Sequence, residues 1–150
     1  MRKFALAALM VFVAALFAGI GPAQADDAII TAILNGANER PGPGDPDATG
    51  RAVIFIDDDS NMLCLSLRWS NVDGTPSGLH IHFAPPTDPG PVVVPFAVPA
   101  PGATRTFQCV TVANEALLDN IAANPSQYYI NLHSTPTYPA GALRGQLQAT

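Results

Sequence analysis

The chain has 150 residues, of which 48% are hydrophobic and only 13% are charged. This length fits a single domain, and the composition excludes a charge-rich disordered chain. Twelve acidic residues against seven lysines and arginines give a net charge of −5. Because a nucleic-acid-binding domain needs a basic surface to neutralise phosphates, this balance argues against nucleic acid as a partner.

The first 25 residues have the pattern of a secretory signal peptide. Arg2 and Lys3 give a positive start, residues 4–20 carry no charge, and Ala23-Gln24-Ala25 supplies the small residues of a cleavage site. This uncharged segment is only marginally long enough to span a bilayer, which argues against an uncleaved membrane anchor. We therefore expect a secreted or periplasmic protein that is cleaved after Ala25, with residues 26–150 forming one domain.

The exported part is strongly acidic. It keeps five arginines and all twelve acids, a formal charge of −7, and it contains no further apolar stretch long enough to cross a membrane. Such a domain is expected to avoid anionic membranes as well as nucleic acid.

Export also determines how the two cysteines are interpreted. In an oxidising compartment, Cys64 and Cys109 are expected to pair as a disulfide. Two buried free thiols are the alternative. A cysteine-based metal site is the weakest interpretation, because the chain lacks the C-x-x-C spacing of such sites.

Short strands separated by turns account for most of the exported part. Alternating or β-branched apolar residues predict strands at 28–34, 51–56, 62–69, 79–83, 92–96, 104–112, 128–133 and 142–148. Segments rich in Pro, Gly, Asp and Asn separate them. The strand at 51–56 is apolar on both faces, as a buried central strand would be, and Phe83 is expected to face the core with Leu79 and Ile81.

One segment breaks the strand pattern. Asn114 is a good N-cap residue, Leu117, Leu118 and Ile121 recur at helical spacing, and Pro125 ends the run. The sequence therefore predicts seven or eight strands and one short helix. This combination indicates an all-β fold, an antiparallel Greek-key β-sandwich of the immunoglobulin-like or superoxide-dismutase-like kind.

All three histidines of the chain fall in two predicted strands. His80 and His82 are two residues apart, so their side chains point to the same side about 7 Å apart. His133 shares a face with Tyr129 and Asn131 in the strand 128–133. If the two strands are neighbours, three imidazoles converge, and imidazole is a good ligand for Zn(II) and Cu(II). The alternative is a structural role, with the histidines at the surface or hydrogen-bonded to backbone.

Several motifs resemble the CHRD (chordin) domain family, in the order in which that family has them. They are LNGANERP at 34–41 with ATG at 48–50, LHIHF at 79–83, and YINLHS at 129–134 with YPAGALRGQL at 138–147. The resemblance extends over about residues 29–148. It departs at Ala140 and Ala142, where the family often has a glycine and a glutamate. We therefore expect any role of that glutamate, such as metal ligation or pairing with Arg144, to be absent.

The resemblance implies an extracellular domain, here a single-domain secreted member of microbial type. In animals such domains occur as repeats in chordin, a secreted antagonist of bone morphogenetic proteins, but the family has no settled biochemical activity. The positions that match its motifs are His80, His82, Asn131, His133, Arg144 and Gly145.

Three functions remain open at this point, and whether the protein is an enzyme is undecided. The first is an interaction module for an extracytoplasmic protein or a cell-envelope component. The second is a protein that binds Cu or Zn through His80, His82 and His133, with Tyr129, Asn131 and Arg144 around them. The third is a metalloenzyme with one metal ion, because the chain has too few histidines for a bridged copper–zinc site. We rank them in this order, and the first two are compatible.

Overall fold

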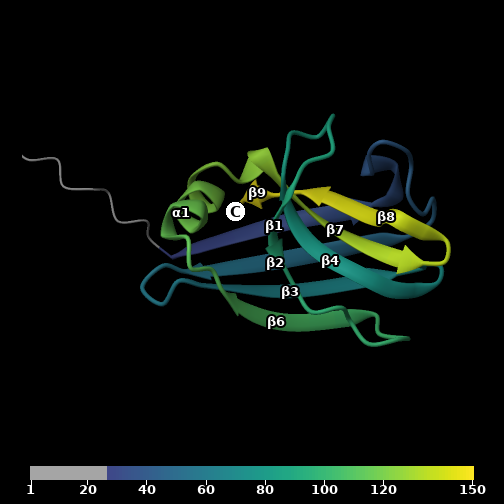
Figure 1. Cartoon of the computed structure of the whole chain (residues 1–150), viewed down its shortest axis with the longest axis horizontal. Coiled ribbons are helices and arrows are strands. Elements are labelled where there is room, and N and C mark those ends of the chain that lie inside the picture. The colour runs from purple at the N-terminus through teal and green to yellow at the C-terminus, as the bar shows by residue number, and fades with distance from the viewer. Residues whose placement is uncertain (1–26) are drawn as a thin grey trace, which may run out of the picture.

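The computed structural model describes residues 27–150, which form antiparallel strands and one short α-helix (Figure 1). The predicted signal peptide lies outside the described residues. The strands are β1 (Ala28–Asn35), β2 (Thr49–Asp57), β3 (Met62–Ser70), β4 (Thr75–Phe83), β5 (Val92–Pro95), β6 (Arg105–Thr111), β7 (Tyr128–Thr135), β8 (Tyr138–Gln146) and β9 (Gln148–Ala149). The predicted all-β class is confirmed.

The strands join in the order β5-β4-β7-β8-β1-β2-β3-β6, and β9 pairs with β1. Only one residue pair, Asn35 with Arg144, connects β1 to β8. The sheet therefore curls into two halves, β5-β4-β7-β8 and β1-β2-β3-β6. The pairings β3–β6 and β4–β7 skip strands in the sequence, so the chain crosses repeatedly between the halves, as it does in a Greek-key sandwich.

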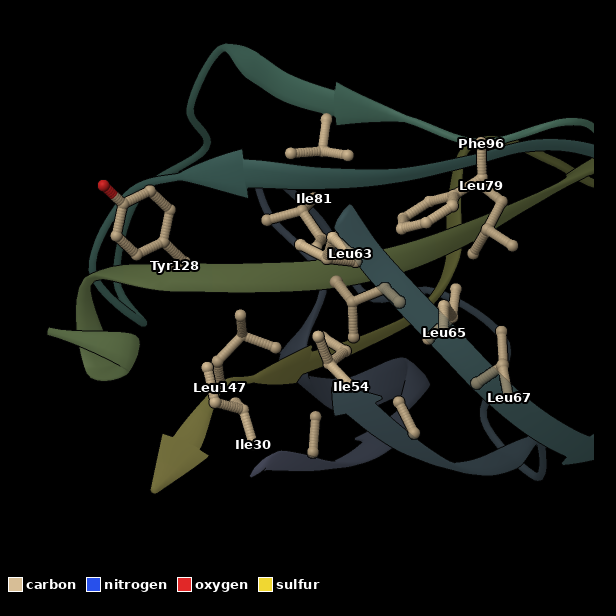
Figure 2. Packing of buried hydrophobic residues seen from close by; sticks show 14 of the residues in the cluster. Ile30, Ile54, Leu63, Leu65, Leu67, Leu79, Ile81, Phe96, Tyr128 and Leu147 are labelled. Atoms are coloured by element: carbon tan, nitrogen blue, oxygen red, sulfur yellow. The ribbon is translucent and has the colours of Figure 1, made fainter. Parts of the chain in front are cut away.

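The core lies between the two halves of the sheet. Figure 2 shows side chains from both halves packed together, among them Leu63, Leu65 and Leu67 of β3. These three leucines are fully buried, as the alternation of the sequence predicted. Leu79 and Ile81 meet them from β4.

Two predictions about individual faces were wrong. Phe83 is 44% exposed, because β4 ends there and the side chain leans on Tyr128 at the edge of the molecule. The strand at 51–56 is not buried on both faces, since Val53 and Phe55 are 37% and 39% exposed. Nothing among the described residues covers the outer face of β2, although Val53 and Phe55 on that face are apolar.

The predicted helix is confirmed as α1 (Glu115–Ala123), with Asn114 at its N-cap. Leu118 and Ile121 bury its apolar face. A short 3-10 turn (Pro125–Gln127) then leads into β7. Within residues 27–150, no helix is long and apolar enough to cross a membrane.

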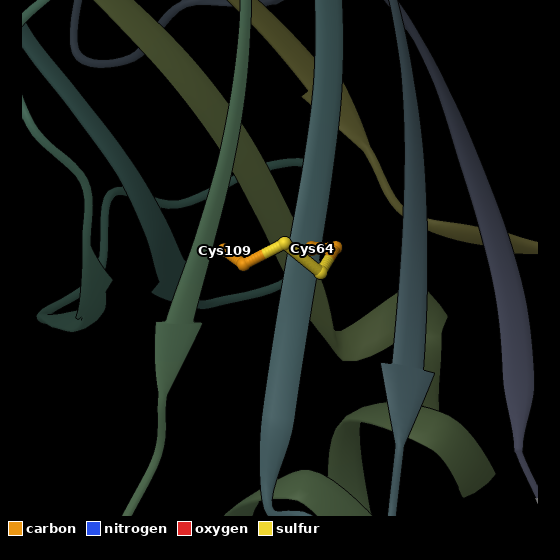
Figure 3. Close-up of a disulfide and its surroundings, with 2 residues drawn as sticks. All are labelled: Cys64 and Cys109. Atoms are coloured by element: carbon orange, nitrogen blue, oxygen red, sulfur yellow. A yellow bond between two sulfur atoms is a disulfide. The ribbon is translucent and has the colours of Figure 1, made fainter.

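The predicted disulfide is confirmed. Cys64 of β3 and Cys109 of β6 stand directly opposite each other in the strand register, and their sulfur atoms are bonded (Figure 3). The bond closes a loop with a sequence separation of 45 residues. A loop of that length corresponds to about 4 kcal/mol of stabilisation on the chain-entropy model.

Candidate functional site: a three-histidine cluster

The structure brings the three histidines together. β4 and β7 are hydrogen-bonded neighbours, and His133 lies opposite Gly78 while His80 lies opposite Asn131. His80, His82 and His133 therefore share the face of the sheet that points away from the core. Each offers one ring nitrogen, and the three nitrogens lie within 4.8 Å of one another. The ring of His80 sits between the other two, with centroid distances of 5.6 Å to His82 and 5.2 Å to His133.

Gly78 makes the space that these rings occupy. It follows a register shift between Pro76 and Gly78, and its α-carbon faces the cluster. A β-carbon there would lie 2.9 Å from Cε1 of His80 and 3.2 Å from Cδ2 of His133. A glycine is therefore required for the rings to approach one another in their present positions.

Backbone carbonyls orient two of the rings. Nδ1 of His82 donates to the carbonyl of Gly90 at 2.8 Å, and Nδ1 of His133 donates to the carbonyl of Pro139 at 3.0 Å. In a neutral imidazole, a proton on Nδ1 leaves the lone pair on Nε2. Histidines that bind metals are commonly held in this way by a carbonyl behind the ring.

Two ring nitrogens of the cluster are buried without a hydrogen-bond partner. They are Nδ1 of His80 and Nε2 of His133. Nε2 of His82 has a partner, because it lies 3.0 Å from Oδ1 of Asn131. An amide oxygen can only accept, so this contact favours a protonated His82 ring.

Burial keeps His80 and His82 uncharged. Loss of solvent lowers the pKa of His80, and the neighbouring His133 and His82 lower it further. Burial also lowers the pKa of His82, and this effect outweighs the hydrogen bonds to Gly90 and Asn131, which act in the opposite direction. Both rings are therefore neutral at pH 7, which is the form that binds metal ions.

The side chains of His82, Tyr129 and Arg144 stack on one another and form a stacked column at one side of the cluster. The ring of His82 stacks on Tyr129, with a centroid distance of 4.7 Å and an angle of 5° between the planes. The guanidinium of Arg144 lies 3.5 Å from the centre of the Tyr129 ring on that column. Arg144 is fully buried and donates to the carbonyls of Pro85 and Asp88. Its side chain thus ties the loop 84–91 down over His82.

Glu39 is the residue of this region to which the sequence analysis gave no role. It is 3% exposed, its Oε1 has no hydrogen-bond partner, and burial raises its pKa to about 7, against the opposing effect of Arg144. Ala142 is buried where the family often has an acid, so Glu39 is the carboxylate that faces Arg144 here. A β-carbon at Gly141 would collide with this carboxyl group. The motif LNGANERP contained Glu39, but its burial depends on a loop that folds back over β8.

Comparison with known proteins gives one finding. The CHRD domain family model matches residues 30–147, which is most of the described chain. Neither curated proteins nor solved structures gave a match. The residues of the cluster, its stacked column and Glu39 all fall within the matched range. The chain therefore belongs to the CHRD domain family.

Proposed function

We propose that this domain is an exported binding module that holds one Zn(II) or Cu(II) ion through His80, His82 and His133. The observation that carries the proposal is the pair of buried ring nitrogens without a partner, in a cluster whose three ligand nitrogens lie within 4.8 Å. A buried polar atom without a partner costs about 1–3 kcal/mol. A metal ion bound through these two nitrogens and His82 would satisfy both atoms at once.

The cluster needs a small rearrangement to bind a metal ion. Zn–N bonds of about 2.0–2.1 Å place tetrahedral ligands roughly 3.3 Å apart, so the nitrogens must approach one another by about 1.5 Å at most. His80 is only half-buried, so its ring is the one that can move toward the others. His82 would exchange its contact with Asn131 for the metal and keep its bond to Gly90.

Three protein ligands leave a coordination position open. His80 and His133 are partly exposed, so this position faces the molecular surface. Water, or a side chain of a partner protein, would complete the coordination. Metal binding and the interaction role that the CHRD domain suggests would then share one site.

The disulfide supports the proposed export. Disulfides such as Cys64–Cys109 persist in oxidising compartments outside the cytosol. Secreted and periplasmic proteins meet these conditions. The proposed localisation is accordingly extracellular or periplasmic.

Metal content tests the proposal. The protein is purified without a histidine tag, loaded with Zn(II) or Cu(II), dialysed and analysed by elemental mass spectrometry. We expect about one ion per chain, and the single substitutions His80→Ala and His133→Ala should remove it. Ser77→Ala, an exposed change on the same strand, is the matched control and should keep the ion.

Folding of each variant is checked by thermal unfolding. His80 and His133 are chosen because they are partly exposed, whereas His82 supports the stack on Tyr129. A wild-type protein that holds no metal after loading would disprove the site. Folded variants that bind as much metal as wild type would disprove the ligand set.

A further inference from the structure

The outer face of β1-β2-β3-β6 is a patterned surface that the histidine cluster does not use. Along β2 the side chains on this face read Arg51, Val53, Phe55 and Asp57, which is positive, apolar, apolar and negative. The strand register places residues of β1, β3 and β6 beside these residues, so the face consists of rows that run across the strands. Along β2, two apolar residues thus separate a positive end from a negative end.

The two middle rows carry exposed apolar side chains. Ile29 and Phe55 stand side by side, followed across the sheet by the disulfide. The next row consists of Thr31, Val53, Ser66 and Phe107, so two polar side chains stand among its apolar ones, and Phe107 is 71% exposed. Contiguous exposed apolar side chains of this kind mark contact surfaces on soluble proteins.

The positive end is a row of three arginines. Arg51, Arg68 and Arg105 are direct cross-strand neighbours, and all three are exposed. Like charges directly opposite each other on a sheet are unfavourable. The rows on either side supply no acid, because they contain Thr31, Val53, Ser66 and Phe107 on one side and Asn35, Thr49 and Ser70 on the other. The row therefore lacks a counter-charge on its own face.

The negative end carries a matching excess of acid. Asp57, Asp58 and Asp59 form the β2–β3 turn, and Glu115 and Asp119 of α1 lie close to it. Loss of solvent and the charge of Asp119 raise the pKa of Asp58. On β2, Arg51 and Asp57 are about 20 Å apart, at about 3.4 Å per residue.

We propose that this face binds a second copy of the chain, with a two-fold axis that runs across the strands between the rows of Val53 and Phe55. Rotation about this axis places the arginine row of one copy against the acidic turn of the other. The two middle rows, with their apolar side chains, then cover each other. A two-fold axis along the strands would instead stack arginines on arginines, so the charges select one of the two face-to-face arrangements.

Sedimentation velocity across protein concentrations tests the dimer. The patch spans only four short strands, so the dimer is expected to be weak, and the series must extend to about 1 mM. Phe107→Ser should weaken dimerisation at least tenfold, because it removes the most exposed apolar side chain of the face. A protein that stays monomeric throughout would overturn the proposal.

Charge reversal tests the axis. One variant carries Arg51→Glu and Arg68→Glu, and the other carries Asp58→Arg and Asp59→Arg. Each alone should be monomeric, since like charges then meet at both ends of the interface. An equimolar mixture should form a heterodimer. The glutamates of one variant then face the new arginines of the other, and the unchanged acidic turn of the first faces the unchanged arginines of the second.

The matched control carries a charge reversal at an exposed acid in the loop 84–91, which belongs to the other half of the sheet, Asp88→Arg. It should dimerise as the wild type does. Charge-reversed variants that still dimerise alone, or a mixture that remains monomeric, would overturn the proposed arrangement.

Discussion

At the residue scale, the polar side of β4-β7-β8 is organised around groups that burial forces to be neutral or paired. Arg144 finds two carbonyls and the face of Tyr129, and His82 finds a carbonyl and Asn131. Glu39 has no such full set of partners. Burial therefore opposes the ionisation of Glu39 in the folded protein.

Substitution of Glu39 by glutamine should stabilise the metal-free protein at high pH only. The pKa of Glu39 is about 7 in the folded protein and 4.5 when exposed, so the folded state holds a proton that the unfolded state releases between these values. Stability is unaffected below pH 4.5, falls as the pH rises to 7, and is lower by about 3 kcal/mol above that. Glutamine cannot ionise. Urea unfolding should therefore show equal stabilities at pH 4 and a more stable Glu39→Gln variant at pH 8.

The same substitution at the exposed Glu115 is the control, and it should produce no comparable dependence on pH. Equal stabilities of Glu39→Gln and wild type at pH 8 would show that the Glu39 carboxylate is well solvated or well paired.

At the element scale, the alternation of apolar and polar residues predicted which segments form strands better than it predicted where each strand begins and ends. β3 matched because Leu63, Leu65 and Leu67 mark its buried face without interruption. β4 begins at Thr75, earlier than predicted, because a proline and a glycine occupy its first half and resemble a turn. The register shift at that point accommodates them. Local sequence could not show this, since it depends on pairing with β7.

Gly78 is the position at which this irregular start of β4 affects the proposed metal site. Gly78→Ala places a methyl group against the rings of His80 and His133, which must then move by a few tenths of an ångström. We expect the affinity for Zn(II) to fall about tenfold, or about 1.4 kcal/mol. Thermal stability should change much less, because the rings are only half-buried. Isothermal titration with Zn(II) measures the effect.

Ser77→Ala, on the same strand with its side chain exposed, should bind Zn(II) as wild type does. Unchanged affinity in Gly78→Ala would mean that the rings have more freedom than their present contacts indicate.

At the whole-molecule scale, the sequence predicted the class of the fold, the helix and the disulfide, because each has a local signature. It identified His80, His82 and His133 as a group because they alternate with core residues on two strands. It could not predict that loops cover the polar face and bury Glu39, or that β2 leaves Phe55 exposed. Both depend on which elements pack over a face of the sheet. The alternation of apolar and polar residues shows which side chains share a face, but it does not predict which element covers that face.

Reduction of the disulfide should destabilise the whole molecule, and not only the contact between β3 and β6. Cys64 and Cys109 join β3 to β6, the last strand of its half, so reduction frees a loop that includes β4 and β5 of the other half. A loss of about 4 kcal/mol is expected, which for a domain of this size lowers the melting temperature by roughly 10–20 °C. Calorimetry with and without reductant measures the change, and Cys64→Ala/Cys109→Ala should melt like the reduced protein. An unchanged melting temperature on complete reduction would show that strand pairing alone maintains β6 in place.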